Sequence, residues 1–174
     1  MTSLKLAKYN IKSSLKSIII YYGIFISVLI GIKMTSNYSG GNGYTNGLEF
    51  SSVVFLFVIG LNSFKENFYF AQANNISRVD YFKASAISIL SIGLSMSIVD
   101  IIINRIYNIF MVSPTMYDMI YNDTYSASPL WIQSNNMQTL LGKLTFSFAF
   151  YIAAFAIGLL ITMIYYKCNK TMKI

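Results

Sequence analysis

The chain has 174 residues, of which 55% are hydrophobic and only 11% are charged. A soluble domain carries about a quarter charged residues, so this composition excludes a chain whose whole surface faces water. The 13 lysine and arginine residues outnumber the 6 acidic ones, but they lie between apolar blocks, which favours a role in membrane topology over nucleic-acid binding.

The apolar blocks are close to the roughly 20 helical residues that cross a hydrocarbon core of about 30 Å. They predict an all-α fold, a polytopic membrane helix bundle that forms a single transmembrane domain over residues 1–174. About four transmembrane helices are expected, together with an N-terminal interfacial helix. The predicted spans are residues 17–33, 48–64, 83–106 and 140–166.

Residues 2–16 have the pattern of an amphipathic helix. At 100° per residue Leu4, Ala7, Ile11 and Leu15 fall on one arc, and four lysines occupy the neighbouring arc. We expect this helix to lie in the membrane interface, although a basic flank that only sets orientation is the alternative. No small-residue cleavage site follows, so we expect the first span to stay in the mature protein.

The polar stretch 65–82 joins the second and third spans. It can remain helical through Gln72, and Asn74-Asn75 then interrupts the helix. Ser77 is followed at the third position by Asp80, which resembles a capping box and predicts the start of the next helix.

The connections on the other side of the membrane differ in length. A glycine-rich stretch after Lys33 predicts a flexible loop, and Glu49 stands at the mouth of the second span. The longer loop 107–139 contains Asp118 and Trp131, and we expect it to rest against the membrane interface.

The basic residues predict the orientation of the spans. Ten of the thirteen lie on the side of the amino terminus, and only Lys33, Arg105 and Lys143 fall on the other side. Because cytoplasmic loops carry the excess of lysine and arginine, we expect both termini in the cytoplasm.

Asp100 is the acidic residue placed well inside an apolar run. A charge in a span usually finds a partner, and Lys143 or, in competition, Arg105 can supply it. The simplest interpretation is a structural pair that fixes the third span against the fourth; a role in a substrate path or in proton coupling stays open. Small and hydroxyl residues in the same two spans favour close helix packing over a polar cavity.

The sequence contains no catalytic set, so we expect no enzyme activity in this chain. Paired aspartates, serine with histidine, a zinc-binding HExxH and a nucleotide-binding GxxxxGK[ST] are all missing from it. Histidine is absent and Cys168 is the only cysteine, so the sequence offers neither an intrachain disulfide nor a cysteine-based metal site. No metal or cofactor is expected.

The order of elements resembles permease subunits of the ABC-2 exporter type: a basic amphipathic helix, a span, a short loop, a second span, a polar helix-turn and a third span. The stretch Asn75-Ile76-Ser77-Arg78, followed by Tyr81 and Phe82, is similar to the NG-(V/I)-S-R-K-x-(Y/F)-F stretch of small bacterial permeases. Asn75 replaces the common glycine and Val79 replaces the common lysine. The resemblance covers residues 1–106 best.

The resemblance implies a coupling segment between the second and third spans that docks into a groove of an ABC ATPase subunit. ATP would be used by that partner, in the bacterial cytoplasmic membrane, together with a second permease copy or a homologous permease. The family usually has six spans and four are counted here, so either the last two are missing or the chain is of a smaller type. The contacts implied at residues 65–78 are Glu66, Phe68, Tyr69, Gln72 and Arg78.

Two functions follow as hypotheses. The first is a permease subunit that exports a peptide, an antibiotic or a lipid-like compound and is energised by a separate ATPase. The second is a non-transporting immunity, sensory or scaffold protein of the membrane, which would work without any ATPase.

Overall fold

A computed structural model of the chain describes residues 3–38, 45–121 and 136–171, and these are helical apart from short connections. Four of the helices are long enough and apolar enough to cross a membrane. The prediction of an all-α bundle with four spans is therefore confirmed. The helices are α1 (Ser3–Tyr38), α2 (Glu49–Ala73), α3 (Arg78–Tyr107), α4 (Met116–Tyr121) and α5 (Met137–Thr171).

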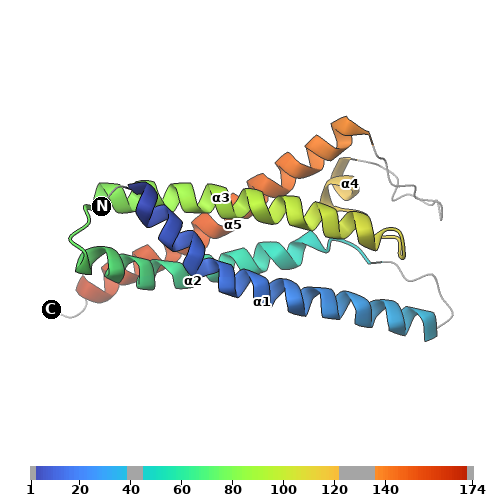
Figure 1. The fold of residues 1–174 in the computed structure, drawn as a ribbon, viewed down its shortest axis with the longest axis horizontal. Helices are drawn as coiled ribbons and strands as arrows, with labels where there is room; N and C mark the ends of the chain where they lie inside the picture. The colour runs from blue at the N-terminus through green and yellow to red at the C-terminus, as the bar shows by residue number, and fades with distance from the viewer. Residues whose placement is uncertain (1–2, 39–44, 122–135, 172–174) are drawn as a thin grey trace.

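The helices form an elongated bundle with two distinct ends (Figure 1). At one end α1 begins, α5 ends and residues 74–77 connect α2 to α3; we call it the terminal end. At the other end α1 stops, α4 lies and α5 begins; we call it the loop end. α2 packs most extensively against α5, and α3 packs against both α1 and α5.

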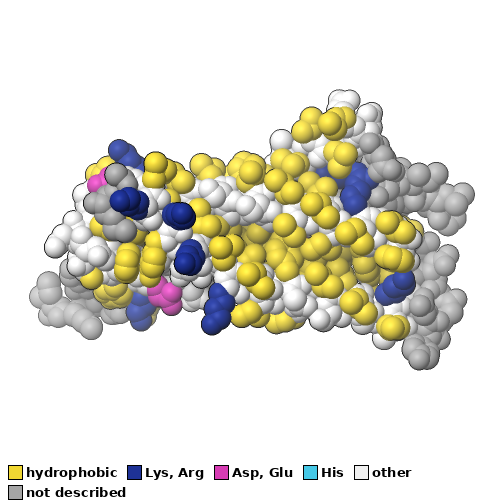
Figure 2. Space-filling view, viewed as in Figure 1, with side chains coloured by type: hydrophobic (Ala, Val, Ile, Leu, Met, Phe, Trp, Pro, Cys, Tyr) yellow, Lys and Arg dark blue, Asp and Glu magenta, His cyan; other side chains and the backbone are white. Residues whose placement is uncertain are grey.

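The sides of the bundle are apolar, as helices that face lipid require. Ile24 on α1 is 61% exposed and Ile164 on α5 is 62% exposed. Figure 2 shows a broad hydrophobic band along the bundle, with most of the Lys and Arg side chains on this face gathered at the terminal end. An apolar surface of this extent would be a liability in water and is stable next to lipid tails.

The predicted interfacial helix is helical, but it continues without interruption into the first span as α1. Its packing agrees with the expected arc at Ala7, which is buried, but not at Leu4, which is 69% exposed, and Leu6 from outside the arc is buried. The reason is that the neighbouring ends of α2 and α3 provide an apolar wall, which includes Phe64 and Ala84. Its placement in a membrane interface stays a prediction.

The backbones of α2 and α5 approach closely at two glycines. A Cβ atom added at Gly158 would lie 2.4 Å from the carbonyl oxygen of Phe57, and one added at Gly60 would lie 2.4 Å from that of Phe155. The Thr162 hydroxyl donates a hydrogen bond across this crossing to the carbonyl of Leu61, at 2.8 Å. Small residues therefore bring backbones together, as in membrane helix pairs generally. The packing predicted between the third and fourth spans is also present, because α3 packs against α5 and the Ser97 hydroxyl donates to the carbonyl of Leu144 at 3.1 Å; the glycine contact between the second and fourth spans was not predicted.

The predicted loop 107–139 contains a helical turn that we did not foresee. α4 begins directly after Thr115, and the side-chain amides of Asn104 and Asn108 hold the preceding segment by donating to the carbonyl of Ser113. Residues 122–135, with Trp131, and most of the glycine-rich loop lie outside the described residues.

Candidate functional site

The α2–α3 connection at the terminal end is a compact turn with defined backbone geometry. The Ile76 N–H donates to the carbonyl of Ala71, and the Asn75 N–H donates to that of Gln72, each at 3.0 Å. This pair of bonds is the Schellman motif that closes a helix. Asn75 has a φ of 52°, a left-handed conformation that glycine and asparagine tolerate best. The helix break predicted at Asn74-Asn75 is therefore confirmed.

The start of α3 is capped as the sequence predicts. The Ser77 hydroxyl oxygen accepts a hydrogen bond from the backbone N–H of Asp80 at 3.1 Å, and the same hydroxyl donates to the Asp80 carboxylate at 2.8 Å. The Ser3 hydroxyl donates to the other oxygen of that carboxylate at 2.9 Å. Ser77 therefore caps α3, and the Asp80 carboxylate ties the beginning of α1 to the start of α3.

Aromatic rings brace the turn against three other helices. Tyr9 of α1 stacks on Phe70 of α2 with centroids 4.1 Å apart. Phe68 of α2 contacts both Tyr81 of α3 and Tyr166 of α5, with ring centroids 5.5 Å apart in each case. A displacement of the turn would therefore shift side chains that pack on all four long helices.

Four of the five predicted coupling contacts are exposed around this turn, and one is not. Glu66, Gln72 and Arg78 are exposed, and Tyr69 is 48% exposed. Phe68 is partly buried in the aromatic packing, so it supports the surface and contributes little area to it. The turn thus presents an acid, a base, an amide and an aromatic ring on a braced frame.

The loop end buries its charges. Lys143 on α5 forms a salt bridge with Asp118 on α4, with Nζ and Oδ2 2.6 Å apart and both side chains 1% exposed. Asp118 also accepts bonds from the backbone N–H and the hydroxyl of Thr115, at 3.2 and 2.8 Å. Arg105 is half-buried on α3, close enough to Asp118 to interact with it electrostatically.

The predicted pairing of Asp100 with Lys143 is wrong. Asp100 is buried on α3 and accepts hydrogen bonds from the hydroxyls of Tyr22 on α1, at 2.9 Å, and of Tyr151 on α5. These donors satisfy the carboxyl group without a cation. Lys143 instead pairs with Asp118. This carboxylate lies on the short helix α4, outside the four spans, and α4 packs against α5.

Glu49 completes the buried polar region of the loop end. One of its carboxylate oxygens accepts a hydrogen bond from the backbone N–H of Met116 at 2.9 Å, which attaches α4 to the start of α2. Glu49, Asp100 and Asn104 also line a cavity of about 10 Å³, the size of a single water molecule. The arrangement can hold helices together, but it offers no room for a substrate.

The sequence missed Tyr22, Tyr151 and the salt bridge of Asp118. One signal was present: Thr115 precedes Asp118 by three residues, the same spacing as Ser77 and Asp80. Among the described residues no group of three or more Cys, Asp or Glu side chains is placed to hold a metal ion. Comparisons with family models, with curated proteins and with solved structures found no match.

Proposed function

We propose that the chain is a membrane-spanning permease subunit that is driven by a separate ABC ATPase, which it binds through the α2–α3 turn at the terminal end. The proposal rests on one observation: an exposed surface of mixed polarity lies on a frame that hydrogen bonds and aromatic packing hold in place. The surface consists of Glu66, Tyr69, Gln72 and Arg78. The resemblance of residues 75–82 to ABC-2 permeases points to the same turn. The terminal end would then lie in the bacterial cytoplasm, and the substrate would be a peptide, an antibiotic or a lipid-like compound.

The mechanical part of the proposal rests on the contacts of the turn. A docking surface transmits movement only if its residues shift together with the spans. The Schellman motif, the Ser77 cap and the Ser3–Asp80 bond fix the turn to α1, α2 and α3, and Tyr166 links it to α5. Nucleotide-driven movement of an ATPase bound there would therefore move the spans as rigid bodies.

The surface is also positioned to attract a partner electrostatically. Seven exposed lysines and Arg78 lie in the terminal half, where they outnumber the acidic groups, so an acidic groove on a partner would be steered to this end. These lysines are Lys5, Lys8, Lys12, Lys16, Lys65, Lys83 and Lys167.

The test is co-purification from the native host of the tagged full chain, solubilised in a mild detergent. We expect a vanadate-sensitive ATPase activity in the purified material. Arg78→Glu combined with Tyr69→Ala should lower the co-purified ATPase activity by about tenfold or more, because charged and aromatic contacts at the centre of an interface dominate its binding energy. Lys12→Glu, which reverses one of these exposed charges outside the turn, should lower it by less than about twofold, because a peripheral charge affects the rate of association more than the strength of binding.

Two results would contradict the proposal. If no ATPase activity accompanies the wild-type chain although the chain itself is folded and functional, the non-transporting hypothesis replaces it. If Lys12→Glu removes the activity as fully as the change at Arg78 and Tyr69, general charge attraction explains the binding and the turn has no special role.

A further inference from the structure

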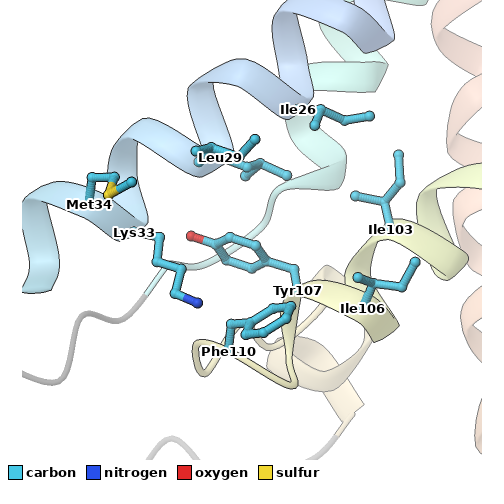
Figure 3. A pocket seen from close by; sticks show the side chains of 9 residues that line it. Ile26, Leu29, Lys33, Met34, Ile103, Ile106, Tyr107 and Phe110 are labelled. Carbon is cyan, nitrogen blue, oxygen red and sulfur yellow. The ribbon is translucent and has the colours of Figure 1, made fainter.

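An apolar groove opens between α1 and α3 near the loop end, with a volume of about 530 Å³, which is within the range of ligand pockets (Figure 3). α1 forms one wall, and the end of α3 with the residues after it forms the other. The groove is lined by Ile26, Leu29, Ile30, Lys33, Met34, Ile103, Ile106, Tyr107 and Phe110.

The walls of the groove suit a hydrocarbon chain. Seven of the nine lining side chains are aliphatic, methionine or phenylalanine, and Ile30, Ile106 and Phe110 are largely exposed at its opening. Because the opening lies on the side of the bundle, between two membrane-spanning helices, it faces the lipid phase. The component that fills such a groove in a bilayer is an acyl chain rather than water.

Lys33 gives the groove a charged rim. Its Nζ atom lies 3.8 Å from the centroid of the Phe110 ring, and in Figure 3 the amine points toward that ring. Within the described part of the chain Lys33 forms no ion pair, and it is the one charged residue that lines the groove. It lies in the last turns of α1, where a lysine reaches toward the headgroup region.

A cation at the rim of an apolar groove complements a molecule with an anion at one end and a hydrocarbon chain at the other. We propose that this groove binds one anionic phospholipid, with an acyl chain between α1 and α3 and the phosphate on Lys33. The proposal depends on the membrane placement of the helices and not on the ATPase partner, so either proposal can fail while the other holds.

The experiment is native mass spectrometry of the detergent-purified full chain during titration with phosphatidylglycerol or with phosphatidylcholine. We expect one phosphatidylglycerol to bind in preference to phosphatidylcholine. Lys33→Gln should weaken phosphatidylglycerol binding by about tenfold or more and remove the preference, since a charge-assisted hydrogen bond is lost. Ile30→Trp should reduce the binding of both lipids by filling the groove; Ile106→Trp does the same from α3.

Matched controls lie on the same helix. Lys16→Gln removes an exposed charge at the other end of α1, and Ile24→Trp adds the same bulk at an exposed position outside the groove; both should bind phosphatidylglycerol as the wild type does. Circular dichroism melting curves show whether each variant is folded, and only folded variants are compared.

Three outcomes would overturn the proposal. If Lys33→Gln retains wild-type affinity for phosphatidylglycerol, the rim does not hold the phosphate. If glycerol phosphate without acyl chains competes as well as the lipid, this is a site for free anions. A dimer that carries no lipid and dissociates in Ile30→Trp would assign the groove to a second copy of the chain.

Discussion

The two ends of the bundle use the same helix cap in opposite surroundings. At the terminal end Ser77 and Asp80 begin α3, and at the loop end Thr115 and Asp118 begin α4, each with the hydroxyl oxygen accepting from the backbone N–H three residues later. Asp80 remains near the surface and is bonded to Ser3, whereas Asp118 is buried against Lys143. A local motif therefore decides where a helix begins, and the tertiary surroundings decide whether its carboxylate becomes part of an exposed surface or of a buried ion pair.

The largest effect should come from breaking the buried pair. Lys143→Met removes the salt-bridge partner of the buried Asp118 carboxylate and should lower the free energy of unfolding by about 3–5 kcal/mol. Equilibrium unfolding in mixed detergent micelles measures this loss. Lys16→Met, at an exposed position, should change the same quantity by less than about 0.5 kcal/mol. Equal losses in the two variants would mean that Lys143 and Asp118 are not a buried pair.

The close crossing of α2 and α5 should be the next most sensitive feature. Gly158→Ala places a Cβ atom against the backbone of α2 and should lower the free energy of unfolding by about 1–3 kcal/mol. Gly31→Ala meets no atom within 4 Å and should be neutral or slightly stabilising, because alanine favours a helix over glycine. The same unfolding measurement compares them, and a neutral Gly158→Ala would refute the close crossing.

The two caps themselves should differ in strength. Ser77→Ala removes two hydrogen bonds with Asp80 at an exposed helix start and should lower the free energy of unfolding by about 1 kcal/mol. Thr115→Ala should lower it further, because the carboxylate that loses its hydroxyl donor there, that of Asp118, is buried. If melting curves rank Ser77→Ala as the more damaging change, the contrast drawn between the two ends is incorrect.

The smallest effect is expected at the turn between α2 and α3. Asn75→Gly suits the left-handed backbone conformation and should change the free energy of unfolding by less than about 0.5 kcal/mol. Asn75→Val, which disfavours a positive φ, should be clearly destabilising by comparison. Parallel thermal melts of the two variants decide this, and equal losses would show that the turn is not held in this conformation.

Features that depend on residues close together along the chain were predictable from the sequence. The four spans follow from the length of the apolar blocks, and the turn at Asn74-Asn75 and the cap at Ser77 follow from local backbone chemistry. The partner of Asp100 was not predictable, because Tyr22 and Tyr151 lie on two other helices and their approach depends on how those helices cross. Lys143 was misassigned for a related reason: its partner lies on α4, a short helix within a region that composition describes only as a loop.

The central claim is that the α2–α3 turn lies in the cytosol, where an ATPase can reach it, and single-cysteine labelling tests it most directly. Cys168 is exposed near the end of α5 and is first replaced by serine. Gln72→Cys then places a thiol at the turn, and Asn46→Cys places one at the exposed loop end. With a membrane-impermeant maleimide we predict that intact cells label Asn46→Cys, and that Gln72→Cys is labelled only after permeabilisation. Labelling of Gln72→Cys in intact cells would contradict the proposed topology and, with it, the docking of an ATPase at this turn.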